Sequence, residues 1–374
     1  MSSKIIHIIS FDNPYPPNYG GVIDVFYKIK AFHNAGIDVI LHCFVKERNR
    51  IEEPLRNICK NIYVYNYKNK GSKLFSELPF SVELRNDIDL LRSRIKSHEP
   101  ILFEGLKTTL SVIHGYFVQN QKFLRLHNLE ENYYNGIAKS ESNLIKKLLF
   151  KWEAIKYKKL NIYSKFNQVL TISNSEQQEL QKKGISSIYL PVFNGNENVV
   201  PLSEFGEFVF FHGDLRTSDN MRAAKFLISL FNKDVDYKLV IASSSGEKEI
   251  QALIKGSKNI YFEKLKDEAH LKELFKKAHV NISWSFQNSG TKLKLINSLY
   301  NSRFCIINNN VVDDEHAVEL CLQAETGKQL INTVNMLMNK PYTEEEINKK
   351  KKFLYEAFDD AKNIQQILQQ MNFN

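Results

Sequence analysis

The chain has 374 residues, 43% hydrophobic and 25% charged, which is the composition of an ordinary globular protein but too long for one core. We therefore expect two domains of roughly 150–200 residues. The formal net charge of +9 predicts an anionic partner, such as nucleic acid, an acidic membrane surface or a phosphorylated substrate. The scattered cysteines exclude a disulfide framework and a zinc site, and no apolar run reaches the roughly 18 residues of a membrane span. The N-terminus leads directly into a strand-like segment, so we expect no signal peptide and a cytoplasmic protein.

Strand-like and helix-like segments alternate through the first half of the chain. Apolar runs predict strands over 4–11, 37–45, 61–67, 101–106, 122–130, 168–173 and 187–193. Helical spacing predicts helices over 22–36, 81–97 and 139–163, and another that begins at Asn174 or Ser175. This alternation is typical of a mainly parallel sheet that is covered by helices on both faces.

A polar, turn-rich stretch with Pro201 covers residues 194–207, and we interpret it as an interdomain linker. The alternation then restarts, with strands expected over 208–213, 237–243, 259–265, 280–286 and 304–309. Helices are expected over 219–232, from 247, over 267–278, from 293 and over 343–371. The sequence therefore predicts an α/β protein with two doubly wound domains, 1–193 and 208–350.

Ligands of open α/β sheets bind beyond the carboxyl ends of the strands, and two such sheets facing each other would form a cleft between them. The loop 12–21 follows the first strand, contains Asn13, and ends in Gly20 and Gly21 before a helix. Paired glycines let a ligand approach the backbone, and a helix N-terminus favours an anion. The alternative is a stiff connecting loop without a ligand.

Polar side chains also end two further strands of the first domain. His127, Asn128 and Glu130 follow one of them, and Glu104 ends another. A histidine at this place could bind a hydroxyl or transfer a proton near neutral pH. Alternatively, His127 and Asn128 cap the adjacent helix. Glu104 could orient an acceptor hydroxyl or belong to a structural turn.

In the second domain, the segment 212–220 follows the first strand and contains Gly213 and Arg216. A guanidinium matches phosphate oxygens, so Arg216 is a candidate phosphate ligand, with a solvated surface arginine as the alternative. A glycine-led turn at 287–294 joins a strand to a helix and carries Lys292 and Lys294. Outward backbone N–H groups, the helix dipole and two lysines favour a diphosphate, although a solvated helix start would have the same sequence.

The stretch 144–160 is strongly basic, with Glu153 as its one acid. Its lysines are Lys146, Lys147, Lys151, Lys156, Lys158 and Lys159. Its apolar stripe consists of Leu144, Leu148, Trp152 and Ile155. One interpretation is a surface helix that contacts an anionic membrane, and the other is a helix whose stripe packs on the sheet. No DNA- or RNA-binding module is recognisable, so we expect no nucleic-acid partner.

Four motifs in order resemble GT-B glycosyltransferases, and most closely the retaining glycosyltransferase family 4. They are PYPPNYGG, LRLHNLEENYY, FFHGDLRTSDNMRAAKFL and SFQNSGTKLKLINSLY, and the resemblance runs from about residue 4 to the end. It implies two Rossmann-like domains that face each other across a cleft, with a C-terminal helix over 351–374 crossing back to the first domain. It also implies a nucleotide sugar on the second domain, an acceptor on the first, and no metal or cofactor.

The resemblance also implies roles for individual residues. Catalysis would involve His127, beside the reacting sugar, together with Lys292 and Glu104. The donor and its diphosphate would be bound by Gly20, Gly21, Gly213, Arg216, Ser289, Gly290, Thr291, Lys292, Lys294 and Asn297. The acceptor would be bound by Asn13, Asn128 and Glu130.

The sequence departs from the family pattern at both donor motifs. Ser289 and Asn297 replace two glutamates that stand eight positions apart, and an amide binds a ribose hydroxyl less strongly than a carboxylate. Asp214 and Asp219 alter the usual basic pair, so Arg216 is the one cation left in that loop.

We therefore expect a retaining hexosyltransferase that uses a UDP- or GDP-sugar and a glycan or lipid-linked acceptor in cell-surface polysaccharide or glycoconjugate synthesis. It would lie in the cytoplasm, peripherally on the inner face of the membrane. The alternatives are a GT-B nucleotide-sugar epimerase and a non-catalytic protein that binds nucleotide sugars.

Overall fold

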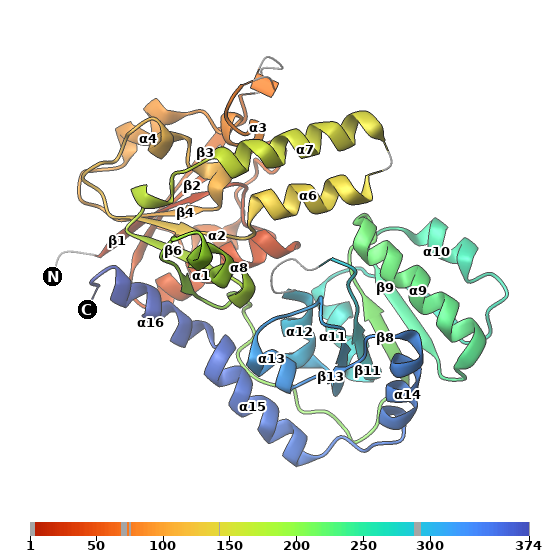
Figure 1. Cartoon of the computed structure of the whole chain (residues 1–374). Helices are drawn as coiled ribbons and strands as arrows, with labels where there is room; N and C mark the ends of the chain where they lie inside the picture. Colours follow the sequence, from red (N-terminus) through yellow and green to blue (C-terminus); the bar gives the residue numbers. More distant parts are fainter. Residues whose placement is uncertain (1–3, 69–72, 75, 142, 288–292, 374) are drawn as a thin grey trace. The chain divides into compact units, whose positions relative to one another are not determined.

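The chain forms two compact units. The computed structural model describes residues 4–68, 73–74, 76–141, 143–287 and 293–373 (Figure 1). Unit 1 comprises Met1–Gly195 and Phe358–Asn374, and unit 2 comprises Asn196–Ala357. The chain thus passes between the units twice, after Gly195 and again after Ala357.

Unit 1 is built on a seven-stranded parallel sheet with the strand order β3-β2-β1-β4-β5-β6-β7. Its strands are β1 (Ile5–Ser10), β2 (Asp38–Val45), β3 (Asn61–Asn66), β4 (Ile101–Glu104), β5 (Lys122–Arg125), β6 (Gln168–Thr171) and β7 (Ile188–Tyr189). Each strand lies within an apolar run of the sequence, as expected for strands that are covered on both faces.

The helices of unit 1 cover both faces of this sheet. They are α1 (Gly20–Asn34), α2 (Glu53–Arg56), α3 (Phe80–Glu83), α4 (Ile88–Arg94), α5 (Leu110–Ile113), α6 (Glu130–Ser140), α7 (Leu144–Lys159), α8 (Asn174–Lys182) and α16 (Asp360–Gln370). On one face, α1 and α16 pack with Ile6 and Ile8 of β1. On the other face, Ile9 packs with Tyr157 of α7 and Leu180 of α8.

Three expected helices differ from the observed ones. The helix expected over 139–163 is two helices, α6 and α7, because the Asn143 side chain accepts a hydrogen bond from the Lys146 N–H and starts a new helix. The segment 81–97 likewise forms two short helices, α3 and α4. The C-terminal helix is also divided. α16 packs in unit 1, which confirms a return to the first domain, whereas most of the preceding helix belongs to unit 2.

Unit 2 repeats the architecture with a six-stranded parallel sheet in the order β10-β9-β8-β11-β12-β13. Its strands are β8 (Phe208–His212), β9 (Leu239–Ser243), β10 (Ile260–Lys264), β11 (Ala278–Ser283), β12 (Phe304–Ile307) and β13 (Leu322–Gln323). Its helices are α9 (Ser218–Asp234), α10 (Glu247–Leu253), α11 (Glu268–Lys277), α12 (Leu293–Asn301), α13 (Glu315–Glu319), α14 (Gly327–Met338) and α15 (Glu344–Phe358), which runs across the unit boundary. The doubly wound α/β fold predicted for both halves is confirmed.

The strand order of each sheet reverses at one place, between β1 and β4 in unit 1 and between β8 and β11 in unit 2. Loops that leave neighbouring strands in opposite directions open a crevice at such a place, and ligands of this fold class bind there. None of the helices in the described part of the chain has both the length and the apolar content needed to cross a membrane.

Candidate active site

Glu104 and His127 form a hydrogen-bonded pair at the reversal point of the unit 1 sheet. Glu104 is the last residue of β4 and is fully buried, whereas the His127 side chain, just beyond β5, is 11% exposed. His127 Nε2 lies 2.8 Å from Glu104 Oε2, and the Phe11 ring packs edge-on against the imidazole. A carboxylate only accepts hydrogen bonds, so it fixes a proton on Nε2 and leaves Nδ1 to meet a substrate.

A buried network of charged side chains fixes the Glu104 carboxylate of this pair. The Lys28 ammonium donates hydrogen bonds to Asp24 Oδ2 and Glu104 Oε1, both at 2.8 Å. The Arg125 guanidinium donates to both carboxylate oxygens of Asp24, from Nη2 to Oδ1 at 3.0 Å and from Nε to Oδ2 at 3.3 Å. It also donates to backbone carbonyls at the end of β6 and just beyond β7. All four side chains are at most 2% exposed. The network therefore ties α1 to the ends of four strands.

The network keeps both acids ionised. Burial alone would raise the pKa of Asp24, but Arg125 and Lys28 hold that pKa well below its ordinary value. Burial would also raise the pKa of Glu104, and Lys28 and His127 lower it instead. Because the pKa of Glu104 is lowered, His127 meets an anionic Glu104 throughout the neutral range.

Asp24, Glu104 and His127 each offer a possible metal ligand, and these atoms lie within 4.8 Å of one another. The Lys28 ammonium, however, lies 2.8 Å from an oxygen of each acid, and Arg125 takes the remaining side of Asp24. A divalent cation would meet two fixed positive charges there. These residues therefore do not fit a metal site.

The predicted loop after β1 is held by its own side chains. Asn13 is 1% exposed, and its amide donates to the backbone oxygens of Arg48 and Arg50 and accepts from Tyr15 N–H. The Asn13 side-chain amide therefore makes its hydrogen bonds to the backbone of this chain. Gly20 and Gly21 are the first residues of α1, and a Cβ on Gly21 would lie 2.7 Å from the Phe11 ring. The Phe11 ring thus lies against both Gly21 of the loop end and the His127 imidazole.

The two other predicted acceptor residues follow His127. Asn128 is half-buried, and Glu130 is 3% exposed as the first residue of α6. Glu130 Oε1 lies 3.3 Å from the ammonium of Lys107, which also lies over the rings of Phe11 and Tyr133. Lys107 and His127 thus both contact the Phe11 ring, and the sequence did not indicate this cation.

In unit 2, His212 and Gly213 lie at the carboxyl end of β8. His212 Nε2 lies 3.4 Å from Ser298 Oγ on α12, and burial, aided by Lys294, lowers the pKa of His212 to about 3. The ring is therefore neutral. Lys294 Nζ donates to Asn220 Oδ1 at 2.9 Å, and a Cβ on Gly213 would lie 2.9 Å from the same amide. The structure thus gathers Gly213 and Lys294 around Asn220.

Arg216 forms a two-pronged ion pair with Asp214, from Nε to Oδ1 at 3.0 Å and from Nη2 to Oδ2 at 2.8 Å. The Arg216 side chain is 77% exposed, so this pair contributes little stability, and a phosphate can compete for the guanidinium. Asp219 accepts hydrogen bonds from Ser285 Oγ and Phe286 N–H, just beyond β11. Asp219 therefore fixes the backbone that leads into the predicted diphosphate turn.

Four residues of that turn, Ser289, Gly290, Thr291 and Lys292, lie outside the described residues. Asn297, the predicted ribose ligand, is half-buried on α12, and its Oδ1 accepts a hydrogen bond from Asn301 at 2.9 Å. The described candidates of unit 2 are therefore Gly213, Arg216, Lys294 and Asn297.

Sequence reasoning missed Asp24, Lys28 and Arg125, although each leaves a signal. Asp24 and Lys28 are four residues apart on the buried side of α1, each directly before an apolar buried residue, Val25 and Ile29. Arg125 interrupts the apolar run of its strand. Charges on an apolar face are costly unless they are paired, so they mark a network even when their partners are unknown.

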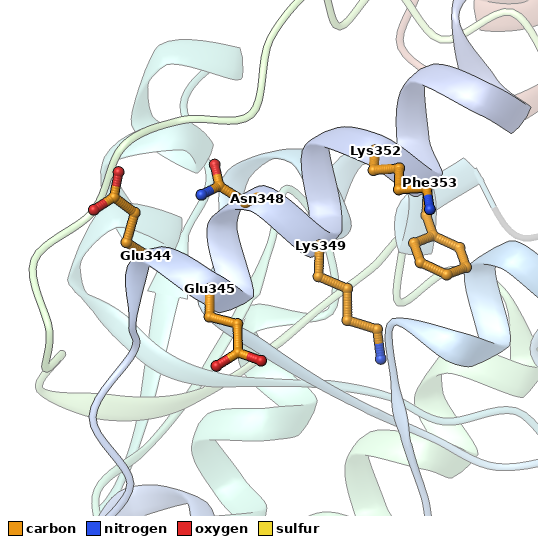
Figure 2. A pocket seen from close by; sticks show the side chains of 6 residues that line it. All are labelled: Glu344, Glu345, Asn348, Lys349, Lys352 and Phe353. Atoms are coloured by element: carbon orange, nitrogen blue, oxygen red, sulfur yellow. The ribbon is translucent and has the colours of Figure 1, made fainter.

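Figure 2 shows a pocket at a different place, along α15 in unit 2. It is lined by Glu344, Glu345, Asn348, Lys349, Lys352 and Phe353. None of the candidate site residues lines it.

The architecture identifies the fold: the chain has the GT-B fold, with two Rossmann-like units and a C-terminal helix that returns to unit 1. A sucrose-phosphate synthase from Thermosynechococcus elongatus is similar with a TM-score of 0.71 at 15% identity, covering 99% of this chain and 98% of that one. A mutant of TarM from S. aureus, in complex with fondaparinux, alpha-GlcNAc-glycerol and UDP, has a TM-score of 0.72 at 10% identity over 99% of this chain and 100% of that one.

Similarity in sequence is more limited. An uncharacterised 44.6 kDa protein of a cps region in Klebsiella pneumoniae is 26% identical over 330 residues, 81% of this chain and 82% of the relative. No family model matches the chain. The comparisons therefore give the fold, and membership of retaining family 4 remains a prediction.

Proposed function

We propose that this chain is a glycosyltransferase that moves a sugar from a nucleoside-diphosphate sugar to a hydroxyl of a glycan or lipid-linked acceptor. The observation that carries the proposal is the Glu104–His127 pair at the reversal point of a GT-B sheet. This pair presents an imidazole of fixed tautomer where this fold class binds its ligands. Neighbours solved with UDP support a UDP-sugar, and GDP-sugars remain the alternative donor.

In this proposal unit 2 binds the donor and unit 1 binds the acceptor. Lys294, Arg216 and the turn 289–292 stabilise the negative charge that develops on the departing diphosphate, and fixed charges of this kind are a large part of catalysis. His127 Nδ1 contacts the transferred sugar or its attacking hydroxyl. We propose that the sugar is a hexose, that attack occurs on the face from which the diphosphate leaves, which retains the anomeric configuration, and that no metal takes part.

We further propose a role in the synthesis of cell-surface polysaccharide or glycoconjugates in the cytoplasm. The support for this role is the relative from a cps region. A neutral Asn297 that is bonded to Asn301, and an Arg216 that is paired with Asp214, favour a second candidate, a protein that binds nucleotide sugars without transferring them.

A transfer assay separates the two candidates. The protein is incubated with UDP- and GDP-hexoses and a panel of glycan and lipid-linked acceptors, and nucleotide release and product are both measured. We expect His127→Ala to lower the rate by on the order of 100-fold, the lower end of what a positioned acid–base group contributes. His33→Ala, at an exposed position on α1, is the matched control. Nucleotide binding without product from any acceptor would instead support the binding protein.

A further inference from the structure

The outer side of α7 exposes large apolar side chains. Leu144, Leu148 and Ile155 are 75%, 67% and 50% exposed. They are separated by four and seven residues, so they lie in one line along the helix. Ile145, at the start of the same helix, is 72% exposed. Most of the expected apolar stripe therefore faces outward, and the interpretation that it packs on the sheet is wrong for these three residues.

The opposite side of α7 is the one fixed to unit 1. Tyr157 is buried in the core, and its hydroxyl lies 2.5 Å from Ser81 Oγ. Glu153 accepts a hydrogen bond from the Ser81 N–H, and Lys156 donates to the Leu74 carbonyl at 2.9 Å. The ring of Tyr134 on α6 stacks on that of Tyr157. Figure 1 shows α6 running alongside α7. These contacts prevent α7 from rotating its apolar line inward.

Lysines flank the exposed apolar line. Lys151, Lys158 and Lys159 are exposed on the same side of the helix, within two turns of Leu148 and Ile155. Lys158 has a long contact of 3.7 Å with Glu131, whereas no carboxylate among the described residues pairs with Lys151 or Lys159. Glu153, the one acid of α7, is on the buried side. We call Leu144, Leu148, Ile155, Lys151, Lys158 and Lys159 the outer face of α7.

We propose that the outer face of α7 docks unit 1 on an anionic phospholipid membrane. A helix that lies in the membrane plane buries leucine and isoleucine at the acyl boundary and keeps lysines at the headgroups. Near an anionic surface each lysine strengthens partitioning by roughly fivefold, so three lysines together contribute on the order of 100-fold. Charge decides between the possible occupants: a second copy would bring like charges together, whereas anionic headgroups pair with them.

The test uses the full-length protein and two vesicle types, one of phosphatidylcholine alone and one of equal parts phosphatidylcholine and phosphatidylglycerol. The apolar variant is Leu144→Ser/Leu148→Ser/Ile155→Ser, and the basic variant is Lys151→Gln/Lys158→Gln/Lys159→Gln. The matched controls are Val118→Ser/Leu253→Ser/Met336→Ser and Lys233→Gln/Lys248→Gln/Lys328→Gln, which change exposed residues away from α7. Co-sedimentation gives the partition coefficient, and circular dichroism confirms that each variant is folded.

We expect the wild type and both controls to bind the anionic vesicles and to bind phosphatidylcholine vesicles far less. The basic variant should bind on the order of 100 times more weakly, and the apolar variant should lose binding even at low salt. Failure of the wild type to bind anionic vesicles, or equal binding by the α7 variants, would overturn the proposal. A dimer in sedimentation velocity that the apolar variant dissolves, without vesicle binding, would assign the face to self-association instead. No nucleotide sugar is present, so the result is independent of the proposed transferase activity.

Discussion

Asp360 joins the two points at which the chain passes between its units. Its carboxylate accepts hydrogen bonds from the Asn194 N–H at 3.0 Å and the Gly195 N–H at 2.9 Å. The Asn194 side chain in turn donates to the Phe358 carbonyl at 2.9 Å. Burial raises the pKa of Asp360 from 3.8 to about 7, although the two backbone N–H groups oppose the shift.

This shift makes the stability of unit 1 depend on pH. As the pH rises above about 4, the unfolded chain loses the Asp360 proton before the folded chain does, so stability that is present at low pH is lost up to about pH 7. About three pKa units correspond to roughly 4 kcal/mol for a fully shielded group. Asp360 is partly exposed, so we expect roughly 2 kcal/mol.

Urea unfolding, followed by circular dichroism across this pH range, measures the effect. Asp360→Asn removes the titrating group, so its unfolding free energy should fall less with pH than that of the wild type. Asp359→Asn is the control, because it removes a neighbouring charge and an asparagine still caps α16. Parallel pH profiles for the wild type and Asp360→Asn would refute the reasoning.

Three further predictions test the described contacts. Asp24→Asn should cost roughly 3–5 kcal/mol of unfolding free energy, since it leaves Arg125 without its buried charge partner; a melting temperature close to that of the wild type would contradict this. Gly195→Ala should destabilise unit 1 strongly, because its φ is +74° and a Cβ would lie 2.0 Å from the Tyr27 ring. Gly115→Ala, at φ +81° with open space, should cost only about 1–2 kcal/mol in the same denaturation series. Asp219→Ala should weaken nucleoside diphosphate binding about tenfold in calorimetry, because Ser285 and Phe286 lose their hydrogen bonds to the Asp219 carboxylate. Unchanged affinity would show that Asp219 does not support the donor site.

The fold was largely predictable because its signals are local. Apolar runs marked the strands and helical spacing marked most helices, and polar residues where those runs ended led to Glu104 and His127. The boundaries were less predictable. The break between α6 and α7 depends on a single capping side chain, Asn143, within a segment whose composition is helical throughout.

The partners of the candidate residues could not be read from the sequence, because they come from distant segments. Glu104 meets Lys28 from 76 residues earlier, and Arg125 meets Asp24 from 101 residues earlier. For the same reason, the sequence did not reveal which side of α7 packs on unit 1. Periodicity reveals an apolar stripe, but contacts from distant residues such as Ser81 and Leu74 show which side of the helix faces the protein.

The most direct test of the proposed function is a thermal-shift titration of the full-length protein with UDP, GDP, CDP and ADP. A ligand at 100 times its Kd stabilises by about 2.7 kcal/mol, which raises the melting temperature by a few degrees in a protein of this size. We predict a shift with UDP or GDP that is lost in Lys292→Ala and reduced in Lys294→Ala. No shift with any of the four would contradict a donor site in unit 2 and, with it, the glycosyltransferase proposal.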